Sequence, residues 1–168
     1  MMKKISLLIA VLFTALLLVG CGETKEKNVE GTLEEIFTKL YADFKEDELP
    51  MLSQTDPLGR TEDMTDEEYS DFVKYYIGSD KLKVKEALAS EPMMTSVAYS
   101  VVLVRMEKGA DIEAAKTEIK ENINPRKWMC VEVPEEDVIV KSKGDLIILI
   151  MVADETTRTK IETAFDNL

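Results

Sequence analysis

Residues 146–153 read LIILIMVA, an unbroken run of eight apolar side chains in which branched residues dominate. Successive side chains of a strand point to opposite faces of its sheet, so a strand that is apolar throughout needs cover on both faces. Residues 96–106, SVAYSVVLVRM, form a second run that is rich in β-branched residues. These two strands predict a sheet inside a mixed α+β domain.

The segments around these strands follow a regular order. From residue 84 onward the sequence predicts strand 84–89, strand 96–106, helix 111–123, an extended piece at 129–133, strand 138–141, strand 146–153 and helix 154–168. This ββα-ββα order is compatible with an internal duplication. Glu91-Pro92 interrupts the first strand, and Lys143-Gly144 forms a turn before the last one. We therefore expect an antiparallel sheet of four to five strands.

Two further helices are predicted ahead of the strands. Thr32 with Glu35, and Thr65 with Glu68, both match the capping box, in which the two side chains bond each other's backbone N–H groups. Gly78 is well placed to end the second helix. We expect this N-terminal pair of helices to cover one face of the sheet and the two C-terminal helices to cover the other. The alternative is that the N-terminal helices leave that face open to a partner.

The composition of the 168 residues excludes several classes of function. There are 33 acidic and 21 basic side chains, and a net charge of −12 argues against binding to nucleic acid. The chain has no histidine, which removes the commonest general base, the usual catalytic triad and every metal site that contains histidine. The length suits one domain with a targeting segment.

The N-terminus has the pattern of a secretory signal. Lys3 and Lys4 are followed by an apolar run at 5–19. As a helix this run would rise only about 22 Å, which is short of the roughly 30 Å hydrocarbon core of a bilayer. The length therefore fits a signal peptide better than a transmembrane anchor.

The apolar run ends in Leu18-Val19-Gly20-Cys21, which resembles the lipobox of bacterial lipoproteins. The resemblance implies that a peptidase cuts between Gly20 and Cys21, and that Cys21 carries a diacylglycerol thioether with acyl chains such as palmitate. Such chains would hold the protein on the extracytoplasmic face of the cell membrane. The alternative is a chance cysteine at the end of an ordinary secretory signal.

These features divide the chain into a signal peptide at 1–20, a flexible tether at 21–31 and a single α+β domain at 32–168. Residues 22–71 hold 16 acidic and 5 basic side chains. We expect repulsion between like charges to hold this part of the protein away from an anionic bilayer.

Two short motifs resemble a known family. They are EPMMTSV at 91–97, followed by the apolar run 101–104 and a Lys108-Gly109 turn, and KSKGD at 141–145 before the last strand. Together they resemble small lipoproteins of Gram-positive bacteria that share a domain of unknown function, DUF4358, over residues 32–153. The resemblance implies the extracytoplasmic location and the α+β architecture. It brings no agreed activity, so no catalytic or binding residue is carried over. The acidic helix at 66–77 departs from the family, which often has a longer segment marked by Gly or Pro there.

Four residues are candidates for a role beyond packing. Cys130 has no partner for a disulfide within the chain if Cys21 is lipidated, and its apolar neighbours favour a buried, inert thiol over intermolecular pairing. Trp128 is interpreted as a plug of the core, with a ligand platform as the alternative. Met93 and Met94 are interpreted as core or edge packing, with an adaptable binding lip as the alternative.

Acidic clusters occur at 43–48, 62–68 and 135–137. We interpret them as solvated faces or helix caps, since the spacing of a calcium-binding loop is absent. Phosphate-binding, dinucleotide-binding, serine-nucleophile and CxxC motifs are also absent from the sequence. The sequence thus predicts no catalytic residue, no metal site and no cofactor.

The resulting expectation is a lipoprotein whose domain binds or scaffolds a protein or cell-envelope partner without catalysis. Two alternatives stay open. A carboxylate-dependent hydrolase acting on cell-wall material would need converging carboxylates with raised pKa values. A weak cation-binding module would use the acidic side chains of residues 43–68.

Overall fold

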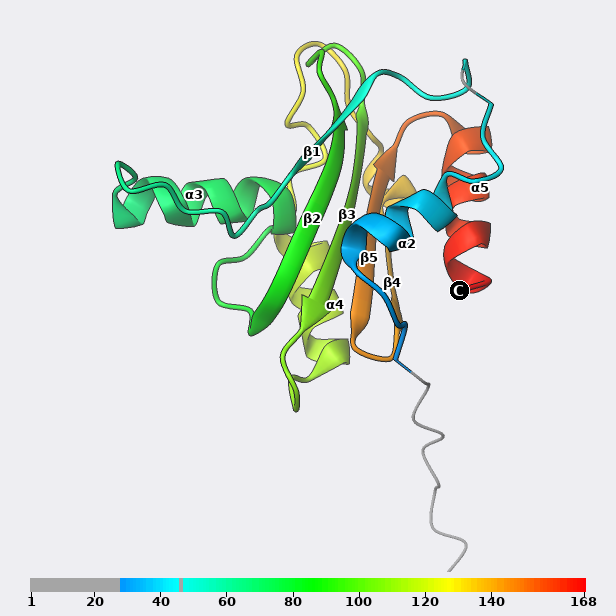
Figure 1. The fold of residues 1–168 in the computed structure, drawn as a ribbon. Helices are drawn as coiled ribbons and strands as arrows, with labels where there is room; N and C mark the ends of the chain where they lie inside the picture. Colours follow the sequence, from blue (N-terminus) through cyan, green and yellow to red (C-terminus); the bar gives the residue numbers. More distant parts are fainter. Residues whose placement is uncertain (1–27, 46) are drawn as a thin grey trace, which may run out of the picture.

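The computed structural model describes residues 28–45 and 47–168 (Figure 1). The predicted signal peptide at 1–20, the lipobox residues Leu18, Val19 and Gly20, the lipidation site Cys21 and the first part of the tether lie outside the described residues. Within the described residues, no helix combines the length and the apolar character needed to span a bilayer.

Five antiparallel strands form one sheet, in the order β1-β2-β3-β5-β4, which confirms the α+β class. The strands are β1 (Leu52–Thr55), β2 (Val84–Pro92), β3 (Tyr99–Met106), β4 (Ile139–Lys143) and β5 (Leu146–Val152). Every residue of β3 and of β5 is buried. The two apolar runs in the sequence are therefore the neighbouring central strands, paired from Tyr99↔Val152 to Arg105↔Leu146.

Four α-helices flank the sheet: α2 (Leu33–Leu40), α3 (Asp66–Ile77), α4 (Ile112–Asn122) and α5 (Glu155–Asp166). Both predicted capping boxes are present, at the N-termini of α2 and α3. Gly78 ends α3 with φ +83°, a conformation that side chains disfavour. A Cβ atom at Gly78 would also lie 2.8 Å from the backbone nitrogen of Ile123, so this glycine lets α3 approach the end of α4 closely.

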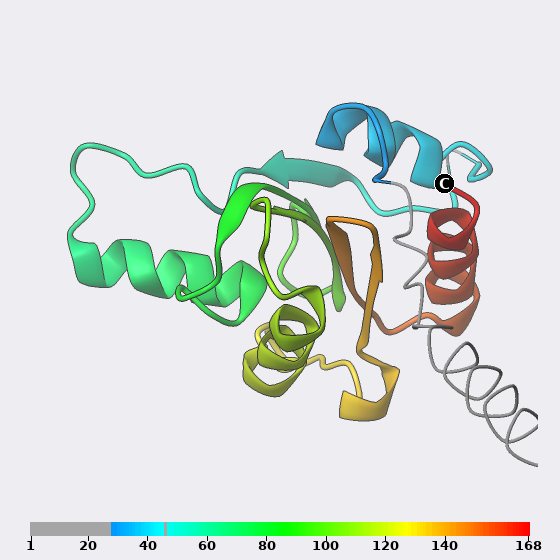
Figure 2. The ribbon, with the colours of Figure 1, turned by 90° about the horizontal axis from the view of Figure 1, so that it is seen from below.

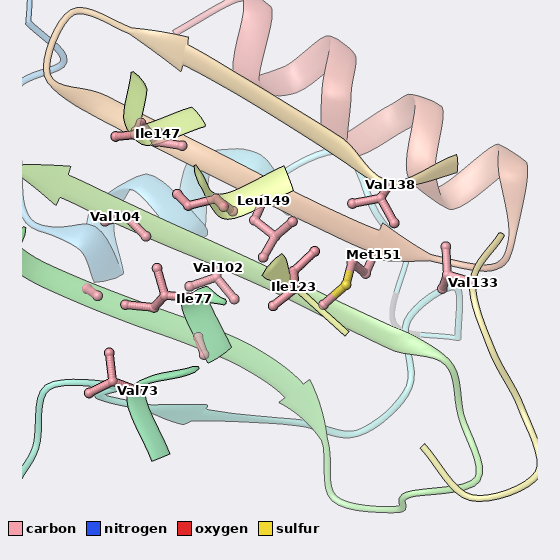
Figure 3. Packing of buried hydrophobic residues seen from close by; sticks show 14 of the residues in the cluster. Val73, Ile77, Val102, Val104, Ile123, Val133, Val138, Ile147, Leu149 and Met151 are labelled. Carbon is pink, nitrogen blue, oxygen red and sulfur yellow. The ribbon is translucent and has the colours of Figure 1, made fainter. Parts of the chain in front are cut away.

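The helices are distributed over the two faces differently from our expectation. The core on one face combines α2 with α5, and the core on the other face combines α3 with α4 (Figure 2). Figure 3 shows the second core, where Ile77 of α3 and Ile123, just beyond α4, meet Val102 and Leu149 of the central strands. The expectation that α4 and α5 share a face was wrong. Because β5 is apolar at every position and β3 carries apolar side chains on both faces, their sequence accepts a helix on either face.

The strands also differ from the prediction in three respects. The stretch predicted to be irregular before α3 contains β1, whose sequence LSQT is short and half polar. Pairing with β1 extends β2 through Pro92, beyond its predicted break. The extended piece predicted at 129–133 is not a strand, and a short 3₁₀ turn at Glu135–Asp137 precedes β4.

The described chain begins in contact with the sheet. Val29 is buried in the core beneath α2, and the Arg105 guanidinium donates hydrogen bonds to the carbonyl oxygens of Val29 (2.8 Å) and Gly31 (2.9 Å). Arg105 is itself buried and forms ion pairs with Glu86 (2.6 Å) and Asp145 (3.3 Å). Val29 and Gly31, which the sequence places in the predicted tether 21–31, are thus bound to the sheet.

Candidate functional site

A cleft of about 720 Å³ opens at the end of the sheet that lies opposite Val29. Three segments that are far apart in the sequence line it: the connection after α2 (44–50), the β2–β3 loop (96–99) and the end of β5 with the first turn of α5 (152–160). Val131 and Glu132 complete the wall. This volume lies within the range of about 300–1,000 Å³ that ligand sites occupy.

The interior of the cleft is mostly apolar, with Phe44, Val97 and Val152 among its lining residues. Tyr99 also lines it, and the Tyr99 hydroxyl donates a hydrogen bond to the hydroxyl of Tyr41 at 3.0 Å. Burial raises the pKa of both tyrosines, so both stay protonated at neutral pH. The cleft therefore offers apolar surface and few free polar groups.

The charged residues of the cleft are engaged with one another or with the backbone. Glu48 pairs with Lys160 at 2.9 Å; a hydrogen bond from the Lys45 backbone and the bond from Lys160 lower the pKa of Glu48. Asp154 caps α5, and its bond from the Thr157 backbone N–H lowers its pKa. These carboxylates are held in place as anions, which is the opposite of a general acid with a raised pKa.

Four exposed methionines lie next to the cleft lining in the sequence, and we call them the methionine lip: Met51, Met93, Met94 and Met129, each between 65% and 76% exposed, although none of them lines the cleft itself. The prediction that Met93 and Met94 are packed was wrong. β2 ends at Pro92, so both side chains lie on a loop beyond the sheet. The backbone N–H of Met93 donates a hydrogen bond to the carbonyl oxygen of Met51 (3.1 Å), and the backbone N–H of Met129 donates one to the carbonyl oxygen of Thr95 (3.0 Å). These bonds join the three segments that carry the four methionines.

Lys127 fixes the loop that carries Met129. Its side chain is only 2% exposed, and its Nζ lies 2.5 Å from Glu91 Oε1. The same ammonium donates to Ser100 Oγ at 3.3 Å and lies over the ring of Tyr75 at 4.3 Å. Burial lowers the pKa of Lys127, and Glu91 opposes this shift. Nothing in the local sequence distinguishes this lysine from a surface lysine, and sequence reasoning missed it.

Trp128 and Cys130, which follow Lys127 within three residues, differ in exposure. Trp128 is buried in the core, as predicted. Cys130 is exposed and free, so the prediction of a buried thiol was wrong. The cause is local: the backbone at Cys130 adopts φ +61°, in the left-handed region, and this turns the chain outward after Trp128.

The acidic clusters are dispersed among helix caps and ion pairs. Asp66 pairs with Arg60 at 2.6 Å, Glu68 completes the capping box of α3, and Asp137 pairs with Arg158 at 2.9 Å. Within residues 28–45 and 47–168, no group of three or more acidic or cysteine side chains could hold a metal ion.

Comparison of the chain with models of protein families, with curated proteins and with solved structures finds no match.

Proposed function

We propose that this chain is a lipoprotein, anchored through Cys21 to the extracytoplasmic face of the cell membrane, whose domain binds a partner without catalysis at the cleft and the methionine lip. The observation that carries the proposal is the position of the lip. Four exposed thioether side chains lie on three segments joined by backbone hydrogen bonds, and each segment continues into the lining of one apolar cleft at the end of the sheet opposite Val29.

The two ends of the domain suit an anchor at one end and a binding site at the other. Arg105, at the end of β3, holds Val29, whereas Tyr99, at the start of β3, lines the cleft. Six residue steps along a strand separate these ends by about 20 Å. The tether from residue 22 to residue 28 has an r.m.s. reach of roughly 13–16 Å. An anchor at Cys21 would thus leave the methionine lip on the side away from the bilayer.

Methionine is suited to such a binding surface. Its side chain is flexible and polarisable, so a methionine surface adapts its shape to different apolar partners. Large exposed apolar patches on a soluble domain commonly mark interaction sites. We therefore infer that the partner is a protein or a cell-envelope component that presents apolar groups to the lip.

The two alternative functions receive no support from the geometry of the described residues. A carboxylate hydrolase needs a pair of carboxyl groups with separate roles, but Glu48 is bound to Lys160 and Asp154 caps a helix. A cation module would need the acidic side chains of 43–68 to converge, but Asp66 and Glu68 serve an ion pair and a cap.

Site-specific crosslinking tests the binding surface. A photoreactive residue placed at Met94 or Met129 of the full chain in its native cells should give a discrete adduct. The same residue at Thr163, exposed on α5 and outside the cleft lining, is the matched control and should give none. Equal crosslinking from all three positions would contradict the proposal. The anchor is tested separately, because Cys21→Ala should abolish incorporation of labelled palmitate.

A further inference from the structure

The end of the domain at which the described chain begins carries a distinctive arrangement of charge. We define this N-terminal pole by the backbone that meets there, residues 28–31, 79–86, 105–111 and 143–146. Glu107 N–H bonds the carbonyl oxygen of Lys83 (2.9 Å), Met106 N–H bonds that of Asp145 (2.9 Å), and Arg105 reaches Val29. Figure 1 shows these turns together at the lower end of the sheet.

The N-terminal pole is neutral, although the rest of the described protein is strongly acidic. The pole contains six basic and six acidic side chains, whereas the described residues outside it carry a net charge of −13. The acidic excess of residues 22–71, which are next to the predicted anchor in the sequence, therefore lies mainly outside this pole in the folded domain. This pole could therefore approach an anionic surface without strong repulsion.

The basic side chains of the pole are more available than its acidic ones. Lys81, Lys83, Lys85 and Lys108 are exposed, and none of the four has an ion-pair partner among the described residues. Of the acidic side chains, Glu86 and Asp145 bind Arg105, Asp80 binds Ser70 and lies near Lys74, and Asp111 caps α4. Glu30 and Glu107 are the remaining exposed carboxylates that face outward with the lysines.

Lys81 and Lys83 precede β2, Lys85 lies at its start, and Lys108 lies in the turn after β3. Lys81 and Lys83 share the lining of a surface hollow with Gly109 of that turn, which Lys108 immediately precedes. Asp111 and Glu118 also line the hollow, so it is not a pocket for one bound anion. The arrangement instead suits a diffuse contact with a surface that carries many negative charges.

We propose that the N-terminal pole docks on the anionic lipid headgroups of the membrane that holds the anchor. This inference rests on the proposed function, because lipidation at Cys21 would bring the pole to the bilayer. The tether of seven residues ends at this pole, and it cannot extend beyond about 25 Å. The lysines would supply attraction within a Debye length of about 8 Å. Docking there fixes the orientation of the domain and points the methionine lip away from the lipid.

The exposed thiol of Cys130, beside the lip, provides a native labelling site for measuring this orientation. The mature lipoprotein is labelled with a fluorescent maleimide, and energy transfer to acceptors in the headgroups is measured on phosphatidylglycerol and on phosphatidylcholine vesicles. Flotation with both kinds of vesicle first checks the anchor. We expect less transfer on phosphatidylglycerol, because the dye is held far from the bilayer, and high salt should raise that transfer toward the phosphatidylcholine value.

Two matched variants separate the pole from net charge. Lys83→Gln/Lys108→Gln should raise transfer on phosphatidylglycerol, whereas Lys45→Gln/Arg126→Gln removes the same charge at exposed positions outside the pole and should leave transfer low. Equal transfer on the two kinds of vesicle, or equal effects of the two variants, would overturn the docking proposal and leave the anchor standing. A chain that floats with neither kind of vesicle would refute the anchor and the docking together.

Discussion

The buried pair of Lys127 and Glu91 should make a large, coupled contribution to stability. Lys127→Met keeps the length of the side chain but leaves the Glu91 carboxylate, only 15% exposed, without its cation. Removing one partner of a buried pair costs 3–5 kcal/mol, and some water contact at Glu91 places this variant near the lower limit, at about 3 kcal/mol. Glu91→Gln should cost about 2 kcal/mol, because the ammonium keeps its neutral acceptors and its aromatic neighbours.

A double-mutant cycle tests this reasoning. If the two effects were independent, the double mutant Lys127→Met/Glu91→Gln would lose about 5 kcal/mol of stability. We expect it to lose only about 3 kcal/mol, because both charges are gone and no unpaired charge stays buried. The coupling energy would then be about 2 kcal/mol. The assay is urea unfolding followed by far-UV circular dichroism. Lys81→Met, at an exposed lysine that forms no ion pair with the residues the structure describes, is the control and should stay within about 0.5 kcal/mol of the parent. A Lys127→Met variant as stable as the parent, or strictly additive effects, would refute the assignment.

The same cycle has a dependence on pH. Burial lowers the pKa of Lys127 in the folded state, whereas the unfolded value is about 10.4. Between these two values the unfolded chain binds more protons, so the parent should gain stability relative to Lys127→Met as the pH rises through this window. A constant difference in stability across that window would contradict the pKa shift.

Three further predictions concern the fold. Gly78→Ala should cost 2 kcal/mol or more, about 1 for the positive φ and the rest for the approach to Ile123, seen as a lower Tm. Leu149→Ala should cost about 2–5 kcal/mol in urea unfolding, because Leu149 is fully buried in the central strand. Asp154→Ala should cost about 1 kcal/mol at neutral pH through loss of the α5 cap. The pKa of Asp154 is lower in the folded state than its unfolded value near 4, so the stabilisation that its carboxylate gives is complete above pH 4 and is lost as the pH falls through the folded pKa. The difference in stability between the parent and Asp154→Ala, measured by circular dichroism, should therefore vanish in acid.

The elements that local chemistry determines were predictable from the sequence. The capping boxes at Thr32 and Thr65 and the stop at Gly78 occur where expected, because each depends on residues within one turn. The strand β1 was missed because LSQT has neither alternation nor β-branched dominance, and its pairing with β2 alone makes it a strand.

The candidate site was less predictable, since it depends on long-range placement. The burial of Trp128 followed from its size and apolar surroundings. The exposure of Met93 depends on where β2 ends, and that of Cys130 on a left-handed backbone that favours glycine or asparagine rather than cysteine. No local pattern indicates that Phe44, Val97 and Val152 line one cleft.

The clamp at Arg105 has a mechanical consequence. Its guanidinium grips the backbone at Val29 and Gly31, and Arg105 belongs to β3, which is bonded on one side to β2 and on the other to β5. A force applied to the chain ahead of Val29 would therefore act on these two hydrogen bonds, and through Arg105 on the central strand, before it could separate α2 from the sheet.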